Sequence, residues 1–245
     1  MGESRHNPNQ LLKTIQADEG NRNKGHLKIF FGYAAGVGKT YAMLEAAHMA
    51  KQQGIDVVAG YIEPHSRPKT AALLNGLEVL PTSEVLYNGM ILNEFDIDMA
   101  LKRKPQLILV DELAHTNAEG CRHAKRYQDI KELLNAGIDV YTTVNVQHIE
   151  SLCDTVASIT EIVVRERIPD SLFDNADQVE LIDIEPQDLI DRLNTENVYR
   201  QTQAKQAVEN FFTIENLTAL REIALRRCAD RVNILTENAR IKNHG

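Results

Sequence analysis

The stretch Ile29–Leu44, "IFFGYAAGVGKTYAML", passes from an apolar segment through small residues to Gly-Lys-Thr and then to a helix-like pattern. A phosphate-binding loop needs small residues whose N–H groups can point at one anion, a following helix, a Lys for the terminal phosphates and a hydroxyl for magnesium. All of these parts are present. We therefore predict ATP and Mg²⁺ as cofactors, with the nucleotide bound by Gly36, Val37, Gly38, Lys39, Thr40 and Tyr41, and with Thr40 also reaching the metal.

The glycine spacing departs from the strict phosphate-loop pattern. That pattern, G-x-x-x-x-G-K-[ST], places its first Gly at position 33, where this chain has Tyr33, with Gly32 one residue earlier. Two explanations stay open. Either Gly32 serves the turn in a slightly different loop, or Tyr33 adopts the conformation at some energetic cost.

The segments on either side of this stretch repeat one order of elements. We predict a strand over 26–32, a helix over 40–53 closed by Gly54, and a second strand over 55–63. The order recurs at 131–145, where a helix stops at Gly137 and a strand follows. Two such Gly-Ile-Asp-Val junctions indicate crossover units of a parallel sheet. The fold class is α/β, and we expect a P-loop NTPase-like three-layer sandwich with a mainly parallel sheet.

Between these units, "QLILVDE" (106–112) reads as a buried central strand that ends in two acids. In nucleotide hydrolases an acid at such a strand end holds the magnesium shell, and a neighbouring Glu can polarise the attacking water. We predict Asp111 as the metal residue and Glu112 as the catalytic base. Polar side chains after the next strand either sense the terminal phosphate or belong to an ordinary polar loop; they are Thr142, Thr143, Asn145 and Gln147.

The rest of the chain suggests sheet edges followed by helix alone. Two short apolar stretches, 161–169 and 178–186, are expected as further edge strands, and from about Val198 the pattern is helical. We divide the chain into a polar lead-in (1–24), a nucleotide-binding α/β domain (25–197) and a C-terminal helical segment (198–245). An apolar stripe of Leu217, Leu220, Ala224, Cys228 and Val232 is predicted to pack on the domain, with Arg221, Arg226, Arg227 and Arg231 largely off it.

Composition excludes several classes of protein. A net charge of -8 over 245 residues disfavours nucleic acid as a partner, including the helicase function that "DELAH" would otherwise suggest. No apolar run approaches the roughly 18 residues of a membrane span, so no membrane segment is expected and the location is predicted to be cytoplasmic.

His115, Cys121 and His123 match no common zinc spacing. Arg67 and Lys69 follow a strand and either meet phosphate or lie in a solvated loop.

Six motifs in order resemble one family. They are "KIFFGYAAGVGKTYAML", "GYIEPHSRP", "LVDELAHTN", "YTTVNVQHIESL", "RERIPD" and "ALREIALRRCADRV". Together, from about Pro8 to about Val232, the chain resembles the N-terminal cytoplasmic domain of the KdpD family of potassium- and osmotic-stress-responsive sensor histidine kinases. The shifted glycine spacing is similar to that family's version of the loop.

The resemblance implies a sensory module of a two-component system and, as partner, a KdpD-type kinase core or another signalling protein. It ends near Val232, so we expect a short form that lacks the kinase core and is at most a slow ATPase. Two functions follow. In the first, bound ATP is the signal, and the segment from about Asn216 to Asn233 transmits it, unless that segment is simply a core-covering helix. The alternative is an autonomous P-loop ATPase or small-molecule kinase.

Overall fold

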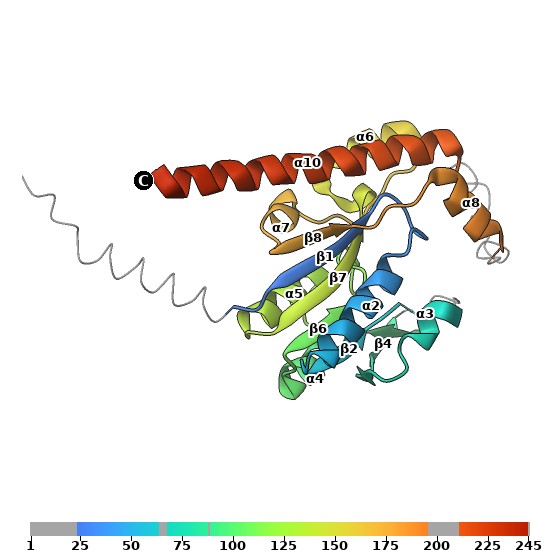
Figure 1. Cartoon of the computed structure of the whole chain (residues 1–245). Coiled ribbons are helices and arrows are strands. Elements are labelled where there is room, and N and C mark those ends of the chain that lie inside the picture. The colour runs from blue at the N-terminus through green and yellow to red at the C-terminus, as the bar shows by residue number, and fades with distance from the viewer. Residues whose placement is uncertain (1–23, 64–67, 88, 196–210, 245) are drawn as a thin grey trace, which may run out of the picture.

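A computed structural model of the chain describes residues 24–63, 68–87, 89–195 and 211–244. Residues 1–23 of the lead-in, Arg67 and the expected start of helix near Val198 lie outside these ranges. The described helices and strands form a three-layer α/β arrangement with one long C-terminal helix across it (Figure 1). Among these helices, none combines the length and apolarity that a membrane crossing requires.

The central layer is a six-stranded sheet in the order β3-β2-β6-β7-β1-β8, in which every strand pair is parallel. The strands are β1 (Leu27–Gly32), β2 (Val57–Tyr61), β3 (Glu78–Val79), β6 (Leu107–Val110), β7 (Asp139–Asn145) and β8 (Gln178–Leu181). All four residues of β6 are buried, as expected for a central strand covered on both faces. The predictions of an α/β class, a parallel sheet and a strand within 178–186 are confirmed.

Two helices cover one face of the sheet. They are α2 (Lys39–Gln52) and α3 (Pro68–Ala72). Phe30 points to this face and packs in one core cluster with Met43 and Leu44 of α2. Gly54 (φ 87°) and Gly137 (φ 81°) take the left-handed conformation just beyond their helices, which stops each helix and turns the chain into the next strand. Both predicted junctions are therefore confirmed.

The opposite face holds the larger part of the core. Its helices are α4 (Ile97–Arg103), α5 (Arg126–Asn135), α6 (Cys153–Thr160), α7 (Asp170–Asp174), α8 (Pro186–Thr195) and α10 (Ile214–His244), and two 3-10 turns, Val146–His148 and Glu150–Leu152, follow β7. Ile29 and Phe31, which flank Phe30 along β1, are fully buried on this face. The alternation of side chains along a strand thus supplies both cores from one apolar run.

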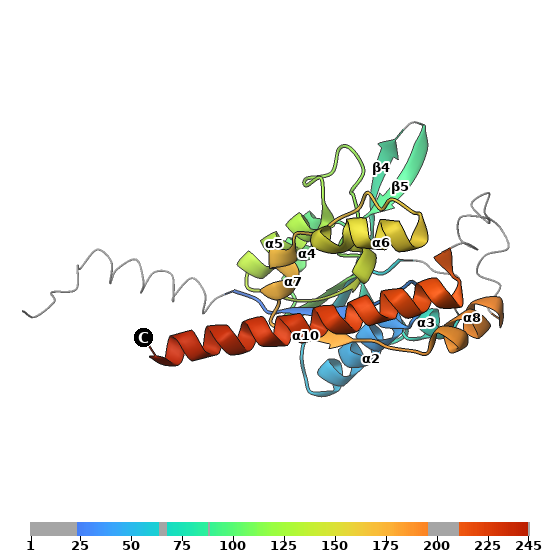
Figure 2. The ribbon, with the colours of Figure 1, turned by 90° about the horizontal axis from the view of Figure 1, so that it is seen from above.

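Two features differ from the sequence-based expectations. Residues 161–169 do not form a strand. The segment beside them is the turn at Ile149, between the two 3-10 helices, and Ile168 makes only an isolated bridge to it. A separate antiparallel hairpin, β4 (Ser83–Tyr87) and β5 (Met90–Glu94), was not predicted. It projects away from the sandwich in Figure 2.

Helix α10 is continuous over 31 residues and runs past the sandwich (Figure 1). Leu217, Leu220 and Ala224 are buried in the core, as predicted, but Val232 is 59% exposed, so the expected apolar stripe is wrong at its end. Arg227 and Arg231 are buried instead. They lie three and seven residues after Ala224, which places them on the same face of the helix.

The buried arginines bind the α7 region of the same chain. Arg227 Nη2 lies 2.7 Å from Asp174 Oδ1, and Arg231 Nε donates to the Phe173 carbonyl at 3.2 Å. The expectation that the four arginines lie off the packed face is therefore wrong for these two.

Candidate functional site

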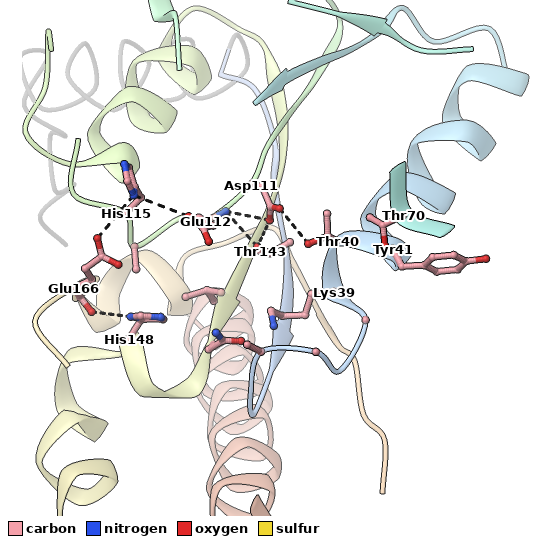
Figure 3. A pocket seen from close by; sticks show the side chains of 16 residues that line it. Lys39, Thr40, Tyr41, Thr70, Asp111, Glu112, His115, Thr143, His148 and Glu166 are labelled. Atoms are coloured by element: carbon pink, nitrogen blue, oxygen red, sulfur yellow. Dashed lines mark hydrogen bonds and ion pairs between the residues drawn. The ribbon is translucent and has the colours of Figure 1, made fainter. Parts of the chain in front are cut away.

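A cavity of about 300 Å³ opens at the carboxyl ends of β1, β6 and β7 (Figure 3). Ligands of parallel α/β sheets bind at this edge, because the strand ends place loops from several units side by side. The lining includes Gly36, Gly38, Lys39, Thr40, Tyr41, Asp111 and Glu112. The structure therefore brings all the predicted site residues except Val37 into one cavity; Val37 is buried in the same loop.

The loop before α2 has the shape of an anion-binding turn. Gly36 (φ 95°) and Gly38 (φ 110°) both take positive φ, which only glycine adopts without strain. Such alternation in a turn aims successive N–H groups at one concavity. Helix α2 begins at Lys39 with no described side chain capping its first amides. These features fit the phosphate groups of a nucleotide.

Gly32 is required for space rather than for the turn conformation that either explanation above assumed. Among the described residues, neither Gly32 nor Tyr33 takes a positive φ. A Cβ on Gly32 would lie 2.6 Å from Val37 Cγ2, so the loop folds back closely over the end of β1 and needs glycine there for space. Tyr33 is fully buried and donates from its hydroxyl to the Ile184 carbonyl at 3.0 Å. Burial and nearby Asp183 raise the pKa of this phenol to about 12, so it stays a donor.

Thr40, in the first turn of α2, and Asp111, directly after β6, meet although they lie in different units of the fold. Thr40 Oγ1 donates to Asp111 Oδ2 at 3.1 Å, and Thr143 Oγ1 donates to Asp111 Oδ1. Asp111 is 1% exposed. A hydroxyl and a carboxylate held side by side are hard oxygen ligands of the kind that Mg²⁺ prefers. This pair fits the predicted metal site.

Glu112 adopts an unusual backbone conformation at the mouth of the cavity. Its φ is 59°, and its amide donates to Asp111 Oδ1 at 3.1 Å and to Thr143 Oγ1 at 3.3 Å. Left-handed residues other than glycine are strained and concentrate at functional sites. Burial and the Asp111 carboxylate raise the pKa of Glu112 to about 7. The side chain faces His115 across the cavity in Figure 3.

Sequence reasoning missed a charged network behind Glu112. His115 Nε2 lies 3.1 Å from both carboxylate oxygens of Glu94, and its Nδ1 lies 4.0 Å from Glu112 Oε2. Glu94 also accepts from the fully buried Arg126 at 3.0 Å. Burial opposes ionisation of Glu94, but the bonds from His115 and the Ala118 amide outweigh it and lower the pKa.

His148 and Glu166 complete the wall of the cavity. His148 Nδ1 hydrogen-bonds the Glu166 carbonyl at 2.8 Å, and burial lowers the pKa of His148, which favours its neutral form. Glu166 Oε1 also accepts from the Thr116 amide. Both residues lie in stretches that carry the family resemblance, "YTTVNVQHIESL" and "RERIPD", but only the folded chain shows that they meet at this cavity.

The predicted phosphate sensors divide into two groups. Thr143 and Asn145 line the cavity, whereas Thr142 and Gln147 do not. The Asn145 side-chain oxygen is buried without a hydrogen-bond partner among the described residues, which suits a ligand-facing group. Neighbouring residues of β7 point to opposite faces, and this alternation separates the two threonines.

The three possible zinc ligands have other contacts. His115 binds Glu94, and His123 Nε2 lies 2.7 Å from Glu132 Oε2. Burial raises the pKa of the Cys121 thiol. No group of three His, Cys, Asp or Glu residues suited to a metal occurs within the described ranges.

Helix α8 also contacts the backbone of the loop before α2. Arg192 Nη1 donates to the Gly36 carbonyl at 3.1 Å and lies 3.5 Å from the Val37 carbonyl. The sequence offered no signal for this contact, since 155 residues separate Arg192 from Val37. The loop is therefore fixed from outside its own strand–helix unit.

The fold and this cavity define a three-layer α/β domain with a phosphate-loop-like turn facing an acidic strand end. The chain belongs to the KdpD family: residues 23–232 match the family described as the osmosensitive K⁺ channel His kinase sensor domain. The predicted family resemblance is confirmed.

Named relatives match nearly the whole chain. It is 62% identical over 237 residues to sensor protein KdpD of Clostridium acetobutylicum, covering 97% of this chain and 26% of that protein. It is 56% identical over 229 residues to sensor protein KdpD of Escherichia coli, covering 94% and 25%. For the putative sensor protein KdpD of Synechocystis, identity is 49% over 221 residues, covering 90% and 60%. The chain thus spans about a quarter of the length of the first two.

Proposed function

We propose that this chain is the Mg²⁺-ATP-binding regulatory module of a KdpD-type sensor histidine kinase that acts at the cytoplasmic side in potassium and osmotic-stress signalling. The observation that carries the proposal is the meeting of Lys39 with the Thr40–Asp111 pair in one cavity beside the Gly36–Gly38 turn. If the protein does not bind ATP with Mg²⁺ in equilibrium titration, the proposal is wrong.

The residues have separate roles in this proposal. The loop amides from Gly36 to Tyr41 and the Lys39 ammonium hold the phosphates, and Thr40 and Asp111 hold the metal. When bound, Mg²⁺ neutralises phosphate charge. Lys39 is 8% exposed and donates to the Ala34 carbonyl at 3.0 Å, which keeps its stem along the loop. Asn145 offers a buried acceptor for a hydrogen-bond donor in the same cavity.

Contacts lead from the loop to α10. Tyr33 holds the Ile184 carbonyl, while the acids on either side of Ile184 bind Arg221 of α10, with Nη2 to Asp183 Oδ2 at 2.7 Å and Nη1 to Glu185 Oε2 at 2.6 Å. A change of loop conformation therefore reaches α10 through the 183–185 segment. Nucleotide shifts α10 only if its two packings differ in ATP affinity. The partner is then a kinase core or another signalling protein that reads α10.

We expect Mg²⁺-ATP to change amide hydrogen exchange along residues 216–231 as well as around Lys39. In Arg221→Gln, which keeps the length but loses the charge that binds Asp183 and Glu185, the change in α10 should be reduced while that around Lys39 persists. Arg226→Gln is the matched control, because Arg226 is 75% exposed and pairs only locally with Glu222 in the described structure. Identical α10 exchange with and without nucleotide would make α10 a core-covering helix only.

The geometry of Glu112 favours a second function, slow ATP hydrolysis. Its partly exposed carboxylate beside Asp111 is placed to orient water, as in the alternative of an autonomous ATPase or small-molecule kinase. In the regulatory function, hydrolysis only resets the signal.

We expect Glu112→Gln to keep ATP affinity within about twofold while lowering turnover roughly 10²-fold, the usual range for loss of a positioned base. Asp111→Asn should instead lose the magnesium dependence of ATP binding. Steady-state phosphate release and calorimetry with and without Mg²⁺ separate the two. Equal turnover in wild type and Glu112→Gln would leave Glu112 without a chemical role.

A further inference from the structure

A second cavity, of about 770 Å³, lies on the other side of the phosphate loop. Gly38, Tyr41 and Thr70 line both cavities, so the two adjoin at the first turn of α2. The second cavity is built from three further segments: α3, the residue after β8 and the end of α8. Its volume lies within the roughly 300–1,000 Å³ typical of small-molecule sites.

The direction of a bound nucleotide follows from the proposed function, on which this inference rests. Lys of a phosphate loop reaches the β- and γ-phosphates, and the metal acid and water-orienting acid stand at the γ end. Here Asp111 and Glu112 lie on one side of Thr40, whereas Tyr41 and Thr70 lie on the other (Figure 3). The α-phosphate and the nucleoside therefore leave the loop toward the second cavity.

The lining suits a base and a sugar. Tyr41 presents an aromatic ring that is 39% exposed and points away from Asp111 in Figure 3, and Ile182 adds an apolar wall. Thr70 and Thr195 provide hydroxyl groups. Arg192 reaches across from α8 to the loop carbonyls, so the cavity and the phosphate loop share one wall.

We propose that this second cavity is the nucleoside-binding site, with the base against Tyr41 and Ile182 and the ribose toward the threonine hydroxyls. Among the described residues that line it, none is Asp, Glu, Asn or Gln. Carboxylates and side-chain amides are the side chains best suited to discriminate between purines, because guanine presents N–H donors where adenine presents an acceptor. The site therefore holds purine nucleosides by stacking and shape, and it discriminates weakly between adenine and guanine.

The test compares Mg²⁺-ATP, Mg²⁺-GTP and Mg²⁺-tripolyphosphate by calorimetry on wild type and Tyr41→Ala. Tripolyphosphate has the phosphates without the nucleoside. We expect ATP and GTP to bind within tenfold of each other, and both at least tenfold tighter than tripolyphosphate. Tyr41→Ala should weaken both nucleotides about tenfold, the size of a lost base–aromatic stack, and change tripolyphosphate affinity less than twofold.

Met49→Ala is the matched control, because Met49 is a 58% exposed apolar residue of the same helix and lines neither cavity. It should bind all three ligands as wild type does. If wild type binds tripolyphosphate as tightly as ATP, or Tyr41→Ala weakens all ligands equally, the nucleoside site is wrong while the phosphate site stands. If wild type binds none of them, the proposed function fails as well.

Discussion

Lys39→Ala should weaken Mg²⁺-ATP binding roughly 10²-fold, the loss expected when a buried charge-assisted contact is truncated, about 2.7 kcal/mol. Lys39 is the cation at the junction of the loop and α2, and its burial removes the screening that would weaken an exposed lysine. Calorimetry at fixed Mg²⁺ measures the change.

The control for this variant is Lys102→Ala. Lys102 is an exposed lysine in the last turn of α4, so its loss leaves the cavity intact. Far-ultraviolet circular dichroism of Lys39→Ala should match wild type, because losing a hydrogen bond such as the one to the Ala34 carbonyl costs about 1 kcal/mol, too little to unfold the domain. A folded Lys39→Ala protein with wild-type ATP affinity would remove the nucleotide from this loop.

Arg126→Met should lower the free energy of unfolding by about 3–5 kcal/mol, since it leaves the buried carboxylate of Glu94 without its cation. Arg126 is fully buried, lies 3.0 Å from Glu94, donates to the Asp111 carbonyl at 3.2 Å and stacks on the Tyr61 ring at 4.0 Å. Urea unfolding followed by circular dichroism gives the difference.

Two further variants separate charge from packing. Arg226→Met removes a largely exposed cation of α10 and should cost no more than about 0.5 kcal/mol. The double variant Glu94→Gln/Arg126→Met should recover part of the lost stability, because no buried charge then stands unpaired. If Arg126→Met is as stable as wild type, Arg126 does not hold the wall behind Asp111.

The sequence was sufficient for the class of the fold and for most strands of the sheet, because these signals are local. An apolar run such as 106–112 reads as a central strand at any position in the chain, and Gly54 and Gly137 mark helix ends by their own backbone freedom. The segment 161–169 carries the same kind of apolar pattern. It lies beside a turn rather than a strand, and hydrophobicity alone does not report the neighbour.

Helix α10 shows the same limit at the level of single residues. Helical spacing located the buried Leu217, Leu220 and Ala224, because periodicity is a property of the sequence itself. The hydrogen-bond partners that the domain offers to the helix cannot be read from this periodicity. Arg231 lies on the packed face because the carbonyls of the α7 region accept from it, while the apolar Val232 is left exposed.

The candidate site also has a part that the sequence predicts and a part that only the fold reveals. The sequence by itself determined the α/β class and the family. It also predicted the candidate residues from Gly36 to Tyr41 with Asp111 and Glu112, since a loop and a strand end each carry their chemistry in consecutive residues. Only the tertiary structure decided that Thr40 touches Asp111, that Glu94, His115 and Arg126 stand behind Glu112, and that Arg192 closes a second cavity. These contacts join residues far apart in the chain, and their formation depends on how the layers pack rather than on any local preference.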